Sequence, residues 1–247
     1  MRPFLFLAAT GMSTIGNLGA TEPQHIASGP ARVALLELFT SEGCSSCPPA
    51  EKWLGALRND PGLWRDFVPV AWHVTYWDRL GWPDRFASRE ATQRQHDFAA
   101  AWDARSVYTP CFVRDGAEWR VRGGKIAAAG GAAAGMLRAS YDGAIVRAEF
   151  VPAETAARGA GAREFEIHAA LLGGGIVSKV TAGENRGETL AHEFVALAQA
   201  RGAPGEPIAL PRKKIAGVTR HALAVWVTRR GDLAPLQAAG GWLRTGD

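Results

Sequence analysis

The sequence of 247 residues, with 47% hydrophobic and 21% charged residues, has the composition of a globular protein and excludes wholesale disorder. Its formal net charge of +4 is spread along the chain, which argues against nucleic-acid binding because such surfaces need clustered basic residues. The length suffices for one large domain or two small ones.

The N-terminal segment, residues 1–20, is predicted to be an export signal peptide. Arg2 supplies a positive start, the residues that follow are uncharged as far as Ala20, and Gly19 and Ala20 offer small residues for cleavage. The apolar run is too short for a stable membrane span, which needs about 20 apolar residues. We therefore expect a periplasmic or secreted protein without stable membrane insertion.

The segment from residue 31 to 141 is predicted to alternate strands with helices. Its first strand is a nearly continuous apolar run, typical of a strand buried on both faces. Ser88 is the expected N-cap of a helix, and Asp115-Gly116 predicts a tight hairpin turn. The expected elements are a strand at 33–39, a helix at 48–57, a strand at 67–74, a helix at 89–104, a hairpin of 111–114 with 117–121, and a helix at 125–140.

The segment from about residue 142 to 247 changes character, because strand-like runs now alternate with glycine-rich turns. It predicts a mostly antiparallel β unit, such as a small sandwich. The expected strands are 144–151, 164–172, 176–181, 207–210 and 223–228, while 190–200 fits either a strand or a short helix.

Two of the three cysteines, Cys44 and Cys47, lie between the first predicted strand and the first predicted helix. A thiol at a helix N-terminus meets unpaired N–H groups and the positive end of the helix dipole, and both favour the reactive thiolate. We therefore expect Cys44 to attack and Cys47 to resolve the mixed disulfide. Because Pro48 and Pro49 follow at once, the helix could begin at or after Cys47, which would weaken the dipole effect on Cys44.

Four segments carry longer motifs: ELFTSEGCSSCPPA at 37–50, HVTYWDRLGW at 73–82, VYTP at 107–110 and GENRGETL at 183–190. In these motifs the chain resembles a family named domain of unknown function 1223, which consists of exported thioredoxin-like proteins. The resemblance covers nearly all of the mature chain. It implies an α/β fold in which a thioredoxin-like three-layer α/β/α domain at 31–141 is followed by a mostly antiparallel β-rich domain at 142–247. It implies no reaction.

The resemblance extends to the wider thioredoxin superfamily, whose members place a cis-proline opposite the cysteine pair. Thr109-Pro110 matches that position by its sequence context, so we expect a cis bond there and a backbone at Thr109 that contacts a substrate chain. Cys111 follows directly, where the family usually has a different residue. It fits a small buried hydrophobic residue, a third redox thiol or a metal ligand.

Glu37 stands inside an apolar strand, where an unpaired carboxylate is unfavourable. One interpretation is a buried acid that transfers protons for Cys47. The other is a structural carboxylate paired with a cation such as Arg32 or Lys52.

His73 ends the second predicted strand, and ligands of α/β sheets gather at the carboxyl ends of strands. It is either a structural histidine or a metal ligand. Together with Cys44, Cys47 and Cys111 it would offer copper or zinc a set of thiolate and imidazole ligands.

Three aromatic residues, Tyr76, Trp77 and Trp82, follow His73 and fit either core positions or an apolar rim that binds a peptide substrate. Asn185, between Gly183 and Gly187, fits a turn that packs the second half of the chain against the first.

Three functions fit these observations. The first is an exported thiol–disulfide oxidoreductase that acts on protein thiols or disulfides through Cys44 and Cys47, needs no cofactor, and exchanges electrons with a redox partner that the sequence does not identify. The second is a periplasmic copper or zinc carrier that uses the same cysteines. The third is a binding module in which the disulfide is only structural.

Overall fold

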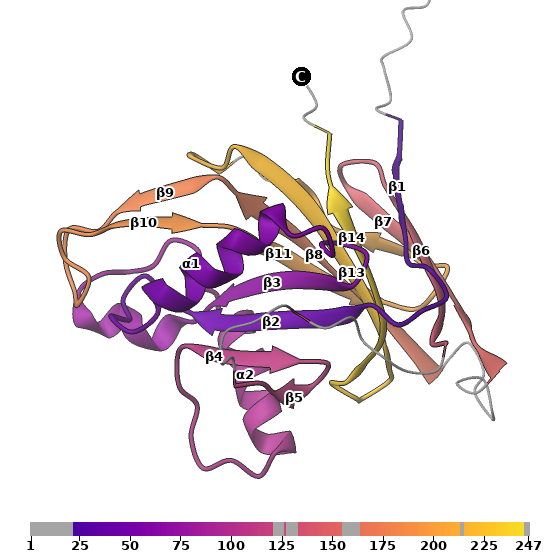
Figure 1. Ribbon diagram of the computed structural model, residues 1–247, viewed down its shortest axis with the longest axis horizontal. Coiled ribbons are helices and arrows are strands. Elements are labelled where there is room, and N and C mark those ends of the chain that lie inside the picture. The colour runs from indigo at the N-terminus through magenta and orange to yellow at the C-terminus, as the bar shows by residue number, and fades with distance from the viewer. Residues whose placement is uncertain (1–21, 121–125, 127–132, 155–163, 213–214, 245–247) are drawn as a thin grey trace, which may run out of the picture.

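The fold is dominated by β-strands. A computed structural model describes residues 22–120, 126, 133–154, 164–212 and 215–244. These residues form an eight-stranded mixed sheet, a four-stranded sheet and a two-stranded ribbon (Figure 1). The predicted signal peptide, residues 1–20, lies outside the described residues. Within the described ranges, no helix is both long enough and apolar enough to cross a bilayer.

The eight-stranded sheet has the order β14-β13-β8-β11-β3-β2-β4-β5. Its members, in that order, are Pro235–Trp242, Arg220–Arg229, Phe165–Gly174, Val195–Gly202, Phe67–His73, Ala34–Thr40, Cys111–Arg114 and Ala117–Glu118. β2 pairs with β3 and β3 with β11 in parallel, and the other neighbours are antiparallel. Every residue of β2 and β3 is buried, as the continuous apolar run of β2 predicts.

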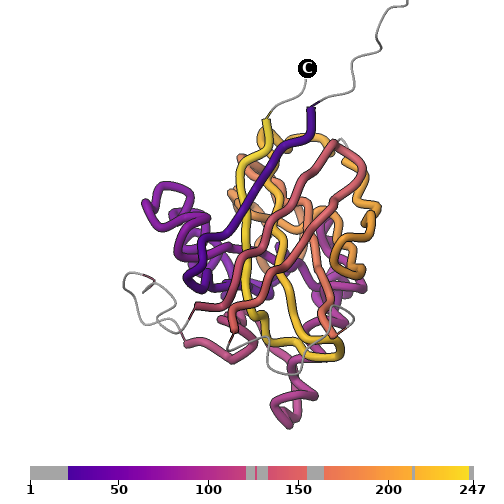
Figure 2. The backbone as a smooth tube through the Cα atoms, turned by 90° about the vertical axis from the view of Figure 1, so that its right-hand side faces the viewer, coloured from indigo at the N-terminus to yellow at the C-terminus, as the bar shows by residue number. Residues whose placement is uncertain are grey.

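The four-stranded antiparallel sheet has the order β1-β6-β7-β12, with the bounds Gln24–Ala27, Gly135–Tyr141, Ile145–Pro152 and Pro207–Ala209. It packs against one face of β8, β13 and β14, and the two layers share a hydrophobic core. Figure 2 shows β1 and β14, from opposite ends of the described chain, side by side. The two-stranded ribbon consists of β9 (Ile176–Lys179) and β10 (Thr189–His192).

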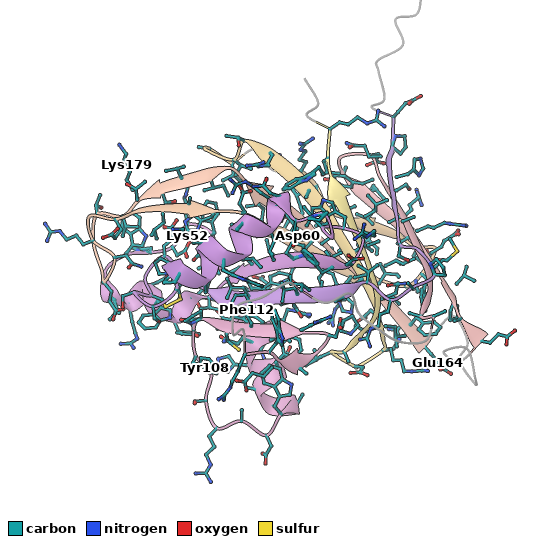
Figure 3. The ribbon with its side chains drawn as sticks, in the orientation of Figure 1. Lys52, Asp60, Tyr108, Phe112, Glu164 and Lys179 are labelled. Carbon is teal, nitrogen blue, oxygen red and sulfur yellow. A yellow bond between two sulfur atoms is a disulfide. The ribbon has the colours of Figure 1, made fainter. Side chains whose placement is uncertain are left out.

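Two α-helices, α1 (Pro48–Ala56) and α2 (Arg89–Ala101), cover opposite faces of the large sheet at its β3-β2-β4 end (Figure 1). Successive residues of a strand point to opposite faces. Phe39 of β2 lies opposite Cys111 of β4, so Phe39 and Phe112, the residue after Cys111, point to opposite faces. Phe39 packs against Phe98 of α2 with ring centroids 6.0 Å apart, and Phe112, labelled in Figure 3, packs against Trp53 of α1 at 5.2 Å. Two 3-10 helices, η1 (Leu57–Asn59) and η2 (Thr75–Leu80), follow α1 and β3.

Ser88 caps α2 as the sequence predicts, because its hydroxyl accepts a hydrogen bond of 3.0 Å from the Ala91 N–H. We expect Ser88→Ala to lower the free energy of unfolding by about 1 kcal/mol in urea denaturation. His96→Ala, at an exposed position of the same helix, should change it by less than about 0.5 kcal/mol. Equal effects of the two substitutions would contradict a capping role for Ser88.

The predicted α/β fold class, a thioredoxin-like three-layer α/β/α domain followed by a mostly antiparallel β-rich extension, is wrong. β11, from the second half of the chain, pairs with β3, so the strands of 165–242 continue the sheet that β2 and β3 begin. The chain is therefore mostly β, with a large mixed sheet and a second sheet packed on it. The pairing of β11 with β3 is non-local, and no pattern in either strand specifies its partner.

The helix predicted at 125–140 is also wrong where the structure describes it. Residues 135–141 form β6, and their burial alternates along the strand as in a sheet with one face in the core. Alanine has the highest helix propensity, but intrinsic propensity is a small free-energy term, and the pairing of β6 with β7 and β1 outweighs it. Residues 125 and 127–132 lie outside the described part. The segment 190–200, which fitted either element, contributes to β10 and β11.

Candidate functional site

The cysteine pair lies in the loop between β2 and α1. Cys44 and Cys47 form a disulfide, and Cys47 is the N-cap residue of α1, with Pro48 and Pro49 following it. Neither proline has an N–H group, and the next two N–H groups bond to the Cys47 carbonyl. This helix end therefore leaves few free backbone donors for the sulfurs, and the dipole effect predicted for Cys44 is weakened.

The disulfide lies directly below the protein surface. Cys44 and Cys47 are 0% exposed, but Ser45 and Ser46 between them are exposed. The Ser46 Oγ atom is 3.3 Å from the Cys44 Sγ atom. In the reduced protein a hydroxyl at this distance can donate a hydrogen bond to a Cys44 thiolate, which stabilises the charged form.

The motif at 183–190 holds the cysteine loop in place. The Asn185 side-chain amide donates hydrogen bonds to the carbonyl oxygens of Glu42 (2.9 Å) and Cys44 (3.0 Å). The neighbouring Glu184 carboxylate accepts a hydrogen bond of 3.1 Å from the Ser45 N–H. Asn185 therefore packs the second half of the chain against the first, as predicted, and does so at the cysteine loop.

The Thr109-Pro110 peptide bond is cis, as predicted. It lies beside the cysteine loop, because the Ser46 hydroxyl donates to the Thr109 carbonyl oxygen at 3.5 Å. The Trp77 indole N–H donates to the Thr109 hydroxyl at 2.7 Å, which fixes Trp77 next to the same loop. The structure thus brings together five of the residues that the sequence singles out: Cys44, Cys47, Trp77, Thr109 and Pro110.

The other two predicted rim residues point inward. The Tyr76 hydroxyl donates to the Gln95 side chain at 3.2 Å, and its ring packs against the main core. The Trp82 indole N–H donates to the Glu42 carboxylate at 2.7 Å. Substrate binding by these aromatic residues stays a prediction.

Glu37 is not brought together with Cys47. Its carboxylate accepts hydrogen bonds from the Trp72 indole (2.8 Å) and from Arg94 of α2 (2.5 Å). Glu37 therefore points to the α2 face of β2, whereas Cys47 begins α1 on the opposite face. Its partner cation is Arg94. The two cations suggested from the sequence, Arg32 and Lys52, do not fill this role. This geometry is that of a buried ion pair, and proton transfer by Glu37 stays a prediction.

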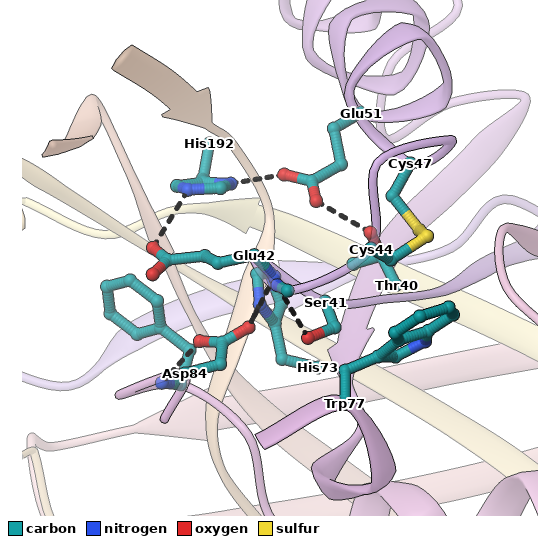
Figure 4. A network of polar contacts seen from close by, with 12 residues as sticks. Thr40, Ser41, Glu42, Cys44, Cys47, Glu51, His73, Trp77, Asp84 and His192 are labelled. Carbon is teal, nitrogen blue, oxygen red and sulfur yellow. Dashed lines mark hydrogen bonds and ion pairs between the residues drawn. A yellow bond between two sulfur atoms is a disulfide. The ribbon is translucent and has the colours of Figure 1, made fainter. Parts of the chain in front are cut away.

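A second group of polar side chains is buried next to the cysteine loop (Figure 4). We call it the His–carboxylate cluster; its members are Glu42, Glu51, His73, Asp84 and His192. His192 lies between two carboxylates: its Nδ1 atom contacts Glu51, and its Nε2 atom lies 3.1 Å from Glu42 Oε1.

The rest of the His–carboxylate cluster is fixed by hydrogen bonds. His73 Nδ1 lies 2.6 Å from Asp84 Oδ2, which also accepts from the Glu42 N–H at 2.8 Å. The Thr40 hydroxyl at the end of β2 donates to Glu51 Oε1 at 2.6 Å. The cluster therefore joins the carboxyl ends of β2 and β3 to α1 and β10.

Charges within the cluster shift its pKa values. Burial opposes the charged form of His192, but the charge of Glu51 and hydrogen bonds to both glutamates raise its pKa to about 10. Burial likewise opposes the charged His73, yet Asp84 raises the His73 pKa, and the charge of His73 lowers the Asp84 pKa to about 2 despite burial. Burial tends to raise the pKa values of Glu42 and Glu51, but His192 lowers both.

The ligand set Cys44, Cys47, His73 and Cys111, predicted for a metal carrier, is not assembled. Two of its thiols are joined in the disulfide, and Cys111 is a free, buried cysteine paired with Phe39 across β2 and β4. Across the described ranges, the group of side chains placed to hold a metal ion is Glu51, His73 and His192, without a cysteine.

Cys111 should be chemically inert in the folded protein. Burial raises the pKa of its thiol, and a hydrogen bond from Tyr108 lowers it by a smaller amount, so the resulting pKa is about 11. At pH 8 the reactive thiolate of Cys111 is therefore scarce. After mild reduction, we expect iodoacetamide to modify Cys44 and Cys47 and to reach Cys111 only on unfolding, as mass spectrometry would show. Equal labelling of all three thiols in the native state would contradict this.

Sequence reasoning missed four members of the His–carboxylate cluster: Glu42, Glu51, Asp84 and His192. One local signal was available, because Glu51 lies four residues after Cys47, one helical turn along α1. Nothing local indicates His192, which is 141 residues from Glu51.

Comparisons with known proteins identify the family and the fold. No curated protein matches the chain. A crystal structure of an Agrobacterium tumefaciens protein is similar with a TM-score of 0.55 and 23% identity, covering 88% of this chain and 97% of that one. HBP35 of Porphyromonas gingivalis is similar with a TM-score of 0.53 and 12% identity, covering 86% of this chain and 76% of that one. At these identities the likeness concerns the fold alone.

Residues 35–228 match the family described as protein of unknown function (DUF1223), and the chain belongs to this family.

Proposed function

We propose that the protein is an exported thiol–disulfide oxidoreductase whose working residues are Cys44 and Cys47. The observation that carries the proposal is the disulfide between them, which lies at the start of α1 beneath the exposed Ser45 and Ser46. A bridge between two cysteines so close in sequence closes a short loop, so it restricts the unfolded chain less than a bridge across a long loop would. Its placement near the surface suits exchange with another protein.

The proposed exchange uses both thiols of the reduced protein. The Cys44 thiolate attacks one sulfur of a substrate disulfide, forms a mixed disulfide and releases one substrate thiolate. The Cys47 thiolate then attacks Cys44 Sγ, closes the Cys44–Cys47 disulfide and releases the second substrate thiolate. Two electrons pass to the substrate, and the reverse sequence oxidises a substrate dithiol. Protein thiols and disulfides are the proposed partners.

The surroundings of the pair support this chemistry. The Ser46 hydroxyl is placed to stabilise a Cys44 thiolate, and the Thr109 backbone lies beside the loop, where a substrate chain would approach. Trp77 offers an apolar surface next to Thr109. The carrier alternative lacks comparable support, because the disulfide leaves no thiolate at either cysteine for a metal.

The test is a catalysed exchange with a peptide whose fluorophore and quencher are joined through a disulfide. Catalytic amounts of the mature protein, recycled by excess glutathione, should accelerate cleavage about tenfold or more over glutathione alone. The denatured and alkylated protein is the control. A rate equal to that of glutathione alone, with the folded protein present, would refute the proposal.

A further inference from the structure

The His–carboxylate cluster takes no part in the proposed exchange, yet three of its side chains converge on one point. Glu51 of α1, His73 of β3 and His192 of β10 each place one ligand atom so that all three atoms lie within 4.8 Å of one another. All three residues are buried. Figure 4 shows that they reach this point from separate elements. We propose that Glu51, His73 and His192 bind one first-row divalent metal ion of the Zn²⁺ type.

His73 gives the first independent support. Its Nε2 atom is buried and has no hydrogen-bond partner, and such buried unpaired polar atoms are rare in proteins. Its Nδ1 atom lies 2.6 Å from Asp84 Oδ2, so Nδ1 is committed to that carboxylate and Nε2 is the ring atom left to bind a metal. Metal-binding histidines usually donate their other N–H to a carboxylate in this way. Coordination by a metal would satisfy the unpaired atom.

His192 repeats this arrangement on the opposite side of the site. Its Nε2 atom lies 3.1 Å from the Glu42 carboxylate, and its Nδ1 atom faces Glu51. A metal between Nδ1 and Glu51 would take the place of that direct contact. The two supporting groups are themselves fixed, because Trp82 donates to Glu42 and Thr40 donates to Glu51. Each histidine ligand thus has its own orienting carboxylate.

The ligand set decides the class of metal. Two imidazoles and one carboxylate suit Zn²⁺ and related first-row ions, whereas Ca²⁺ and Mg²⁺ prefer oxygen ligands alone. Coordination requires neutral imidazoles, so metal binding would displace the protons that the two histidines carry in the metal-free protein. The three carboxylates of the cluster would then carry three negative charges, and a divalent ion would leave a net charge of −1. Three protein ligands also leave a fourth position for water or another small ligand.

A route to the proposed site is present. Glu51 and His192 line a cavity of about 470 Å³ beside α1, whose other charged lining residues are Lys52, Arg58, Glu193 and Arg220. Lys52 is labelled on α1 in Figure 3. The cavity therefore leads to two of the three proposed ligands, while His73 lies behind them.

The experiment is a calorimetric titration of Zn²⁺ into tag-free, chelator-treated mature protein with the disulfide intact. One Zn²⁺ should bind per chain, and Co²⁺ should give visible d–d bands without a thiolate charge-transfer band. Glu51→Gln and His192→Ala should each weaken binding about 100-fold or more, and Asp84→Asn about 10- to 100-fold. His96→Ala, at an exposed histidine, should leave the affinity unchanged.

Circular dichroism of each variant separates loss of the site from loss of the fold, and Glu51→Gln and Asp84→Asn preserve side-chain shape. Folded wild-type protein that binds less than one Zn²⁺, or a thiolate band with Co²⁺, would overturn the proposal. So would unchanged affinity in the folded Glu51→Gln variant. Because the titration uses the oxidised protein and the exchange assay needs no metal, either proposal can fail alone.

Discussion

Replacing Cys44 with serine should lower the rate of thiol–disulfide exchange by about 1,000-fold or more, because the attacking sulfur is removed. Cys47→Ser should also stop turnover, but in a different manner. Its Cys44 still attacks, and without a resolving thiol the mixed disulfide with the substrate accumulates. A quenched-flow rate measurement, with mass spectrometry of the covalent adduct, distinguishes the two variants.

Cys111→Ser is the matched control for this prediction. Cys111 is buried and free, so its replacement should leave the exchange rate within about twofold of wild type once the variant is shown to be folded. Exchange that survives in Cys44→Ser, or is lost in folded Cys111→Ser, would contradict the assignment of Cys44 and Cys47. A disulfide-linked adduct on Cys47 in place of Cys44 would reverse their roles.

Removing the Glu37 carboxylate should destabilise the protein by about 3–5 kcal/mol, since Glu37→Ala leaves the Arg94 guanidinium without its buried counter-ion. The Glu37–Arg94 contact is 2.5 Å long, with Glu37 fully buried and the Arg94 side chain 10% exposed. Arg94 also lies over the rings of Trp72 and Trp226, which keeps it between apolar groups. The free energy of unfolding in guanidinium chloride measures the effect.

Two controls test this explanation. Arg120→Ala removes an exposed ion pair with Glu118, in which Arg120 is 81% exposed, and should cost less than about 1 kcal/mol. The double variant Glu37→Leu, Arg94→Leu removes both charges together and should recover most of the stability lost in Glu37→Ala. A loss below about 1 kcal/mol in Glu37→Ala would show that Arg94 is not held by this carboxylate.

The elements confirmed by the structure are those with local signals in the sequence. The apolar run that forms β2 predicts a buried strand, and Ser88 marks the start of α2. Asp115 and Gly116 both adopt positive φ angles, 53° and 87°, as the predicted hairpin turn requires. Each of these signals depends on residues only a few positions apart, which is why the sequence alone reveals them.

The arrangement of the sheets could not be predicted, because it depends on contacts between distant residues. β14 is rich in alanine and glycine and carries no clear strand pattern. Its buried Gln237 side chain accepts a hydrogen bond of 2.8 Å from the Val33 N–H, 204 residues away, and donates one of 2.8 Å to the Gly135 carbonyl. A glutamine that joins three segments in this way looks like a surface residue in the sequence.

The same distinction between local and distant signals applies to the residues of the candidate site. Cys44 and Cys47 stand out because their spacing has chemical meaning, and Thr109-Pro110 is found through a family resemblance. The His–carboxylate cluster has no such signature, because His192 reaches it from β10 and meets Glu51 across 141 residues. The glutamates that most affect the pKa of His192 are therefore visible only in the folded chain.

The central claim is that Cys44 and Cys47 form a working redox pair, and the most direct measurement is the number of free thiols in mature protein equilibrated across a glutathione redox series. Mass spectrometry after alkylation would assign each thiol. We predict that two thiols, mapped to Cys44 and Cys47, appear and disappear reversibly at a potential above about −300 mV. A Cys44–Cys47 bridge that resists reduction across the whole series would contradict the claim and identify the disulfide as structural.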